Sequence, residues 1–143
     1  MKRLVPILTV LLALAGCGRS EAPDPPATVR LAAVPGRPAA GYFAYRVRGN
    51  RGALVSVSSP QAGRIEMHET MTSGTMTSMR PLTRIPVRDG ETLRFVSGGR
   101  HLMLYDVDAR VRPGGRIVLT LNFERGAPEQ LAALATSAGG DAH

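Results

Sequence analysis

Short runs in which apolar and polar residues alternate recur between about residue 28 and residue 123 of the chain. A side-chain period of two predicts β-strands. Strands at this spacing, without long helical patterns between them, predict a β-sandwich or barrel. We therefore expect one all-β domain over residues 28–125. The turn signals that separate the runs are Pro35-Gly36, Gly49-Asn50, Ser59-Pro60, Ser73-Gly74, Asp89-Gly90, Gly98-Gly99 and Pro113-Gly114.

The alternation also predicts the core of this domain. It is clearest in the last run, residues 116–123, where Arg116, Thr120 and Asn122 lie opposite the apolar face. Burying each large apolar side chain stabilises a fold by about 1.5–3 kcal/mol, so the core needs no metal to form. The predicted core residues are Leu54, Val55, Val57, Leu93, Phe95, Ile117, Leu119, Leu121 and Phe123.

The amino terminus carries an export signal. Lys2 and Arg3 precede an apolar run that is too short for a lasting transmembrane helix but fits a signal peptide. The run ends in LAGC, which resembles the lipobox of bacterial lipoproteins and implies lipidation of Cys17. The alternative is ordinary cleavage near Ala15 or Gly16 that leaves Cys17 free. We predict a signal peptide over residues 1–16 and a periplasmic lipoprotein anchored to a membrane by lipid.

Two segments outside the β-pattern have a different character. Residues 17–27 combine the lipidated cysteine with a polar, Pro-rich stretch that predicts a flexible tether. Residues 126–143 are predicted to form a flexible tail, with one or two helical turns over Glu129–Ala135.

Composition excludes several classes of function. Cys17 is the only cysteine, so the mature domain has none for disulfides, thiolate metal sites or a cysteine nucleophile. The formal net charge of +7 comes mainly from scattered arginines, and Trp is absent. Nucleic-acid binding, which favours a basic stripe with aromatics, is therefore not expected. No Ser/His/Asp arrangement is apparent, so we do not expect an enzyme.

Candidate chemistry lies in four residues: His68, Met79, His101 and Met103. His101 and Met103 are two residues apart in one predicted strand, so they point to the same face. Thioether sulfur is soft and uncharged, a poor ligand for Zn²⁺, Mg²⁺ or Ca²⁺ but well suited to Cu(I), which imidazole also binds. Four neutral ligands around Cu(I) leave a site of charge +1, whose burial costs less than that of a divalent ion.

The spacing of these residues, His-x10-Met-x21-His-x-Met, resembles the signature of the PCuAC family of periplasmic copper(I) chaperones. The stretches VSSPQAGRIEMHET, MRPL, GGRHLMLYDV and LTLNF are also similar. The resemblance implies a cupredoxin-like Greek-key β-sandwich or barrel in which His68, Met79, His101 and Met103 bind Cu(I). It further implies delivery of Cu(I) to the copper-site subunit of cytochrome c oxidase, with a Sco-type partner. The tail has no Met and only His143, so a second copper site is not expected.

Alternatives to this interpretation stay open from the sequence. The same ligands would serve copper buffering or tolerance, and a metal-free lipoprotein would act as an interaction module. Blue-copper electron transfer is disfavoured because it needs a Cys thiolate beside His and Met. Singly, His68 could lie on a solvent face beside Glu66 or Thr70, and His101 could cap the Gly98-Gly99 turn.

Three further methionines lie near the motif. Met67 precedes His68 in the alternation and is predicted to point inward. Met71 and Met76 flank the Ser73-Gly74 turn, where they form either a secondary soft surface near the site or merely an exposed one.

Overall fold

The computed structural model describes residues 27–139, which form ten β-strands. These residues contain no helix, and thus none long and apolar enough to cross a membrane. The all-β prediction is confirmed, whereas the signal peptide, Cys17 and His143 lie outside the described residues. The strands are β1 Thr28–Arg30, β2 Ala39–Arg46, β3 Ala53–Ser58, β4 Ala62–Ser73, β5 Met76–Leu82, β6 Ile85–Pro86, β7 Thr92–Phe95, β8 Arg100–Val107, β9 Arg116–Phe123 and β10 Glu129–Thr136.

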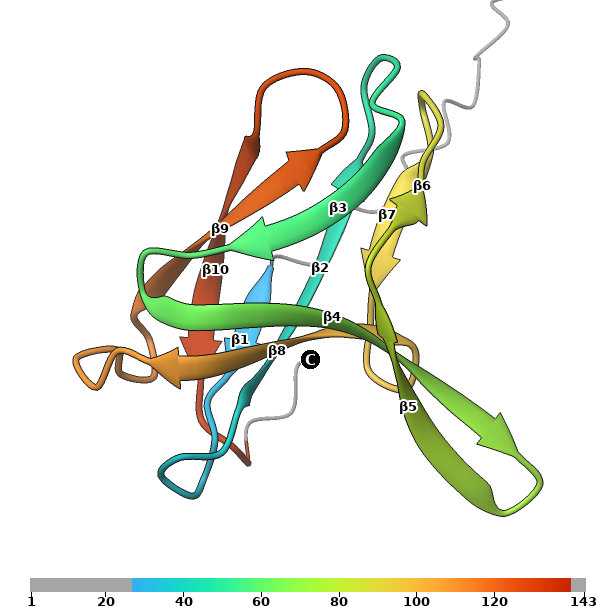
Figure 1. Cartoon of the computed structure of the whole chain (residues 1–143). Helices are drawn as coiled ribbons and strands as arrows, with labels where there is room; N and C mark the ends of the chain where they lie inside the picture. The colour runs from blue at the N-terminus through green and yellow to red at the C-terminus, as the bar shows by residue number, and fades with distance from the viewer. Residues whose placement is uncertain (1–26, 140–143) are drawn as a thin grey trace, which may run out of the picture.

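The strands join in one continuous order, β5-β4-β8-β2-β1-β10-β9-β3-β6, and β7 pairs with β2. The pairing between β1 and β10 is parallel, and the other registers along this path are antiparallel. Figure 1 shows the sheet curling so that β4 and β8 cross in front of β1 and β2. The ends of β4 and β5 extend beyond this body as a two-stranded arm, residues 69–80, which we call the hairpin arm.

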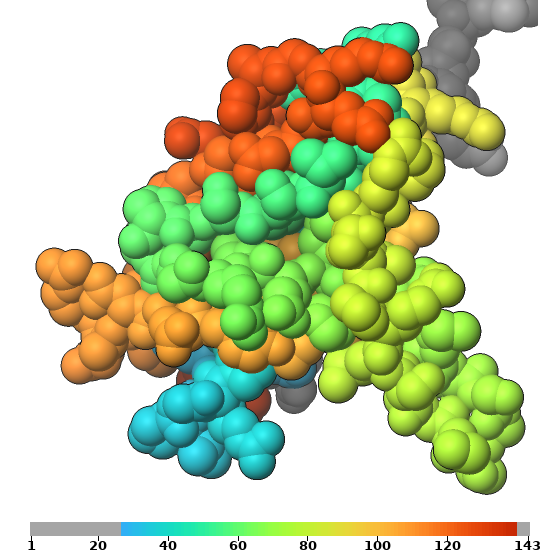
Figure 2. All heavy atoms as spheres, viewed as in Figure 1, coloured from blue at the N-terminus to red at the C-terminus, as the bar shows by residue number. Residues whose placement is uncertain are grey.

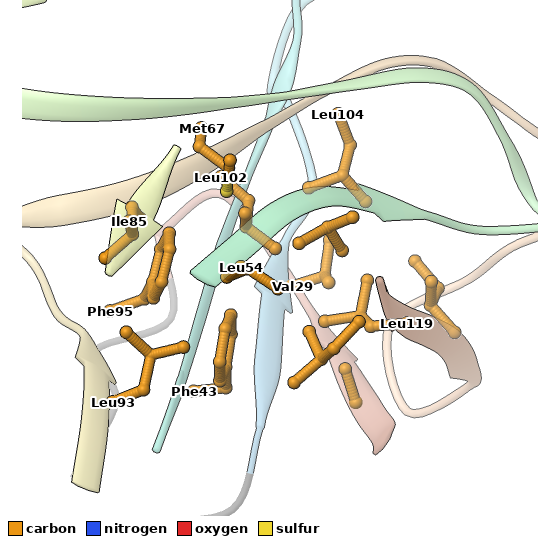
Figure 3. Close-up of a cluster of buried hydrophobic side chains, with 14 of the residues drawn as sticks. Val29, Phe43, Leu54, Met67, Ile85, Leu93, Phe95, Leu102, Leu104 and Leu119 are labelled. Carbon is orange, nitrogen blue, oxygen red and sulfur yellow. The ribbon is translucent and has the colours of Figure 1, made fainter. Parts of the chain in front are cut away.

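One apolar core fills the space inside the curled sheet (Figure 3). Phe43 of β2 and Phe95 of β7 stack with ring centroids 4.5 Å apart. Leu102 and Leu104 of β8 and Met67 of β4 cover the core on the side formed by these two strands. The prediction that the Met67 side chain points inward is therefore confirmed.

The alternation in β9 and β7 is confirmed, because the predicted apolar residues of both strands are buried. In β3 it fails at one position: Leu54 and Val57 are buried, but Val55 is 37% exposed. The register between β3 and β9 shifts between Leu54 and Ser56, as in a β-bulge. Val55 follows the buried Leu54 and points away from the core, so its core assignment is wrong. The extra residue reverses the side-chain direction beyond it and returns Val57 to the core.

The segment after residue 126 corrects the sequence analysis. Residues 129–136 form β10, which pairs with β9 and β1, so the predicted helical turns over Glu129–Ala135 are wrong. The flexible tail is likewise wrong for residues 129–136, because this segment is a strand with Ala133 and Ala135 buried in the core. Ala and Leu favour helices, but pairing with two neighbouring strands overrides a weak local preference.

Arg51 forms hydrogen bonds that stabilise the connection between β9 and β10. Its Nη2 donates to the carbonyl oxygen of Ala127 (2.9 Å) and to Oε1 of Glu129 (2.8 Å). The guanidinium carbon also lies 4.8 Å from the centroid of the Phe123 ring. Arg51 is itself buried, so these partners replace the water that it loses on folding.

Replacing Arg51 tests this anchor. We expect Arg51→Met to lower the free energy of unfolding by about 1–3 kcal/mol, because buried groups lose their hydrogen-bond partners. Urea denaturation followed by circular dichroism measures the change. Arg112→Met is the control, since Arg112 is exposed. Within the described residues, the recorded hydrogen bond of its side chain goes to the carbonyl oxygen of Ala109, three residues earlier. Equal stability of the two variants would contradict the anchoring role.

Candidate metal site

The candidate site lies on β4 and β8, on the face turned away from the core. Side chains of directly paired residues point to the same side of a sheet. The buried Met67 and Leu102, which pair with each other, occupy the core side, so their neighbours His68 and His101 point outward. We call the outward face the site face. Its cross-strand pairs are Arg64 with Tyr105, Glu66 with Met103, and His68 with His101.

The two histidines are neighbours on this face. Their ring centroids are 6.0 Å apart, and the rings are inclined by 33°. His101 is 9% exposed, and the side chain of His68 is 14% exposed. His68 thus lies on the outward face, but its side chain is largely covered. The pairing of β4 with β8 joins two histidines that are distant in the sequence.

One ring nitrogen of His101 is fixed by the turn before β8. Nδ1 of His101 lies 3.1 Å from the carbonyl oxygen of Gly99. A carbonyl only accepts, so Nδ1 carries the proton and Nε2 of the neutral ring keeps a free lone pair. The same carbonyl accepts from the backbone N–H of Thr70 (3.1 Å), which ties the hairpin arm to this turn. Gly98 enters the turn at φ +80°, a conformation that favours glycine. Contact with the turn thus leaves Nε2 free to bind a metal.

His68 has the opposite arrangement. Its Nε2 lies 3.0 Å from Oε2 of Glu66, and a carboxylate accepts, so Nε2 carries the proton. Nδ1 is buried and has no hydrogen-bond partner among the described residues. A buried acceptor left without a partner costs about 1–3 kcal/mol, and a bound cation would remove that cost. This unpartnered nitrogen fits a metal ligand better than a purely structural histidine.

The two methionines of the motif differ in burial. Met103 is partly buried on β8, and its sulfur lies 3.9 Å from the Tyr105 hydroxyl. Met79 lies on β5, opposite Thr70 and therefore diagonal to His68 across the β4–β5 pair. Met79 is 57% exposed. It belongs to the hairpin arm, which projects from the body of the domain in Figure 2. The structure thus places three motif residues together on β4 and β8, with Met79 on the next strand of the same face.

The other nearby methionines do not face the site. Met67 is buried in the core, and Met71 and Met76 are exposed. Met71 pairs with Ser78, and Met76 pairs with Ser73, so both lie on the face of the hairpin arm opposite Met79. Gly74, at φ +60°, makes the turn that reverses the chain between them.

The charges around the site are mostly paired. The hydrogen bond from His68 lowers the pKa of the Glu66 carboxyl below its usual value, and Arg64 and Tyr105 act in the same direction. Glu69 points to the other face, where it contacts Arg80 at 2.6 Å and Arg100 at 3.7 Å. Over residues 27–139, no three His, Cys, Asp or Glu side chains gather as a ligand set. The motif methionines on this face, Met79 and Met103, carry thioether sulfur, a type of ligand that suits a soft ion better than a hard divalent ion.

Comparison with known proteins identifies the family of the chain. The family model described as "Putative lipoprotein LpqE-like" matches residues 26–134. The chain belongs to the LpqE-like family. No curated protein matches this LpqE-like chain significantly.

Solved structures similar to this LpqE-like protein are PCuAC domains and related proteins. The copper-bound PCuAC domain of PmoF2 has 17% identity and a TM-score of 0.62, with 80% of this chain and 91% of that domain covered. The solution structure of CuI-DR1885 from Deinococcus radiodurans has 27% identity and a TM-score of 0.57, with 84% and 83% covered. Its apo form has 23% identity and a TM-score of 0.55, with 96% and 94% covered. The resemblance to PCuAC domains and the cupredoxin-like fold are confirmed.

Proposed function

We propose that this LpqE-like protein is a copper(I) chaperone that binds one Cu(I) through His68, Met79, His101 and Met103. The observation that carries the proposal is the buried, unpartnered Nδ1 of His68 beside a second histidine on the paired strand. Two similar structures are a copper-bound PCuAC domain and a Cu(I) form of DR1885. The role is one of binding and transfer, without catalysis.

The ligand set explains why capture and release are both feasible. His68 and His101 offer one nitrogen each, and Met103 adds a sulfur on the same face. The exposed Met79 supplies the fourth ligand from β5. Thioethers and imidazoles hold Cu(I) less tightly than thiolates do, so a thiol-bearing acceptor can remove the ion. Exposure of one ligand gives that acceptor a point of access.

The proposed setting is the periplasm, with the domain held at a membrane by lipid on Cys17. The lipobox-like LAGC and the lipoprotein description of the family support this anchor. The acceptor that we propose is the copper-site subunit of cytochrome c oxidase, with a Sco-type protein as partner. A lipid anchor would raise the effective concentration of the chaperone near such a membrane-bound acceptor.

Anaerobic titration of the mature chain with Cu(I) against a competing chelator tests the binding step. We expect retention of one equivalent per chain and no comparable retention of Zn²⁺. Failure to retain Cu(I) would overturn the proposal and leave the metal-free interaction module. An intense visible charge-transfer band would instead indicate a blue-copper site.

Deleting the gene tests the delivery step. Loss of cytochrome c oxidase activity that is restored by added copper supports delivery. Copper sensitivity with normal oxidase activity would overturn delivery in favour of copper buffering or tolerance.

A further inference from the structure

Glu66 occupies the centre of the site face, between the histidine pair and Tyr105. Its Oε2 accepts from Nε2 of His68 (3.0 Å) and from the Tyr105 hydroxyl (3.3 Å). Its Oε1 lies 3.1 Å from Nε of Arg64. The guanidinium carbon of Arg64 in turn lies 4.2 Å from the centroid of the Tyr105 ring. Both carboxylate oxygens therefore have partners, and the carboxylate is held from two sides.

This arrangement makes Glu66 a support for a ligand rather than a ligand. A carboxylate whose oxygens already accept from three donors would have to break these contacts to bind a metal. Its bond to Nε2 of His68 instead fixes the ring, so that the unprotonated nitrogen is the buried Nδ1. The negative charge also lies close enough to favour a monovalent cation at that nitrogen.

We propose that Glu66 is a positioning residue that orients the His68 ring so that Nδ1 binds the soft cation. This inference rests on the proposed copper site. Arg64 and Tyr105 hold the carboxylate in place.

Glu66→Leu removes the acceptor and keeps a side chain of similar size. In the metal-free protein, we expect loss of the exchange-protected His68 Nε2–H signal in the NMR spectrum. We expect the Cu(I) affinity to fall by about 10–100-fold, the usual effect of losing the support of a histidine ligand. Glu66→Gln keeps an acceptor without charge, so its His68 signal should shift and its affinity should fall to an intermediate value.

Glu69→Leu is the matched control. Glu69 lies on the same strand, carries the same charge and is paired with Arg80 and Arg100 on the opposite face. We expect wild-type Cu(I) affinity and an unchanged His68 signal in this variant. The inference is overturned if Glu66→Leu has the same Cu(I) affinity and the same His68 signal as Glu69→Leu. If Glu66→Leu does not fold, Glu66→Gln takes its place in this comparison.

The two readouts separate this inference from the proposed function. If the wild-type chain retains no Cu(I), the proposed function fails whatever the His68 signal shows. If the wild type retains Cu(I) and the His68 signal persists without the Glu66 acceptor, only the positioning role fails. Unfolding midpoints of the variants distinguish a lost ligand support from a destabilised fold.

Discussion

Met79→Leu is expected to lower the Cu(I) affinity by an order of magnitude or more while leaving the fold unchanged. Leucine preserves the size and apolar character of the side chain but removes the sulfur, which is the only atom of Met79 that Cu(I) can use. Because Met79 is largely exposed, the substitution creates no cavity. Adding His101→Ala to this variant should abolish retention of Cu(I). Anaerobic chelator competition measures both effects, and circular dichroism checks the fold.

Met71→Leu provides the control for this experiment. Met71 is also an exposed methionine of the hairpin arm, but the β4–β5 register places it on the opposite face from Met79. We expect it to bind Cu(I) with wild-type affinity. If Met71→Leu and Met79→Leu weakened binding equally, Cu(I) would be held by the methionines of the arm in general, and the four-ligand site would be wrong.

Local alternation predicted one half of the site. His101 and Met103 point away from the core because Leu102 and Leu104 between and beside them are buried, as a period of two requires. The pairing of His68 with His101 could not come from local pattern, since antiparallel register is set by contacts between distant segments. Only the motif spacing, through the resemblance to PCuAC domains, indicated that these strands meet.

The support around His68 was not predicted. In the sequence, Glu66 and Tyr105 are ordinary polar residues of two separate strands, and either could face solvent. Their convergence depends on the β4–β8 register, which aligns Glu66 with Met103 and Arg64 with Tyr105. A polar residue two positions before a candidate ligand, and therefore on the same face of a strand, was the available signal.

The carboxyl-terminal strand was missed for a different reason. The segment from Glu129 to Thr136 consists largely of Ala and Leu, which favour a helix, and it follows a Gly- and Pro-containing loop. Its inward side carries Leu131, Ala133 and Ala135 at a period of two. Alanine also occurs on the outward side, so inward and outward positions differ little in hydrophobicity. In the folded sheet this segment lies between β1 and β9 and pairs with both, which favours a strand. That position is defined only once the rest of the sheet has formed.

Truncation after Gly126 therefore has a large expected effect, whereas a flexible tail would predict none. Removing β10 deletes the buried Ala133 and Ala135 and takes away the strand that joins β1 to β9. It also removes Ala127 and Glu129, two partners of the buried Arg51. Small domains are stable by about 5–15 kcal/mol, so these combined losses should prevent cooperative folding.

Thermal unfolding followed by circular dichroism measures this effect. A chain that ends at Gly139 keeps all of β10 and should unfold at the wild-type temperature. The chain that ends at Gly126 should show no cooperative transition and retain no Cu(I), because β4 and β8 hold the site only as part of the folded sheet. A cooperative transition at the wild-type temperature in the shorter chain would mean that β10 is dispensable for the fold and that the domain ends near residue 125.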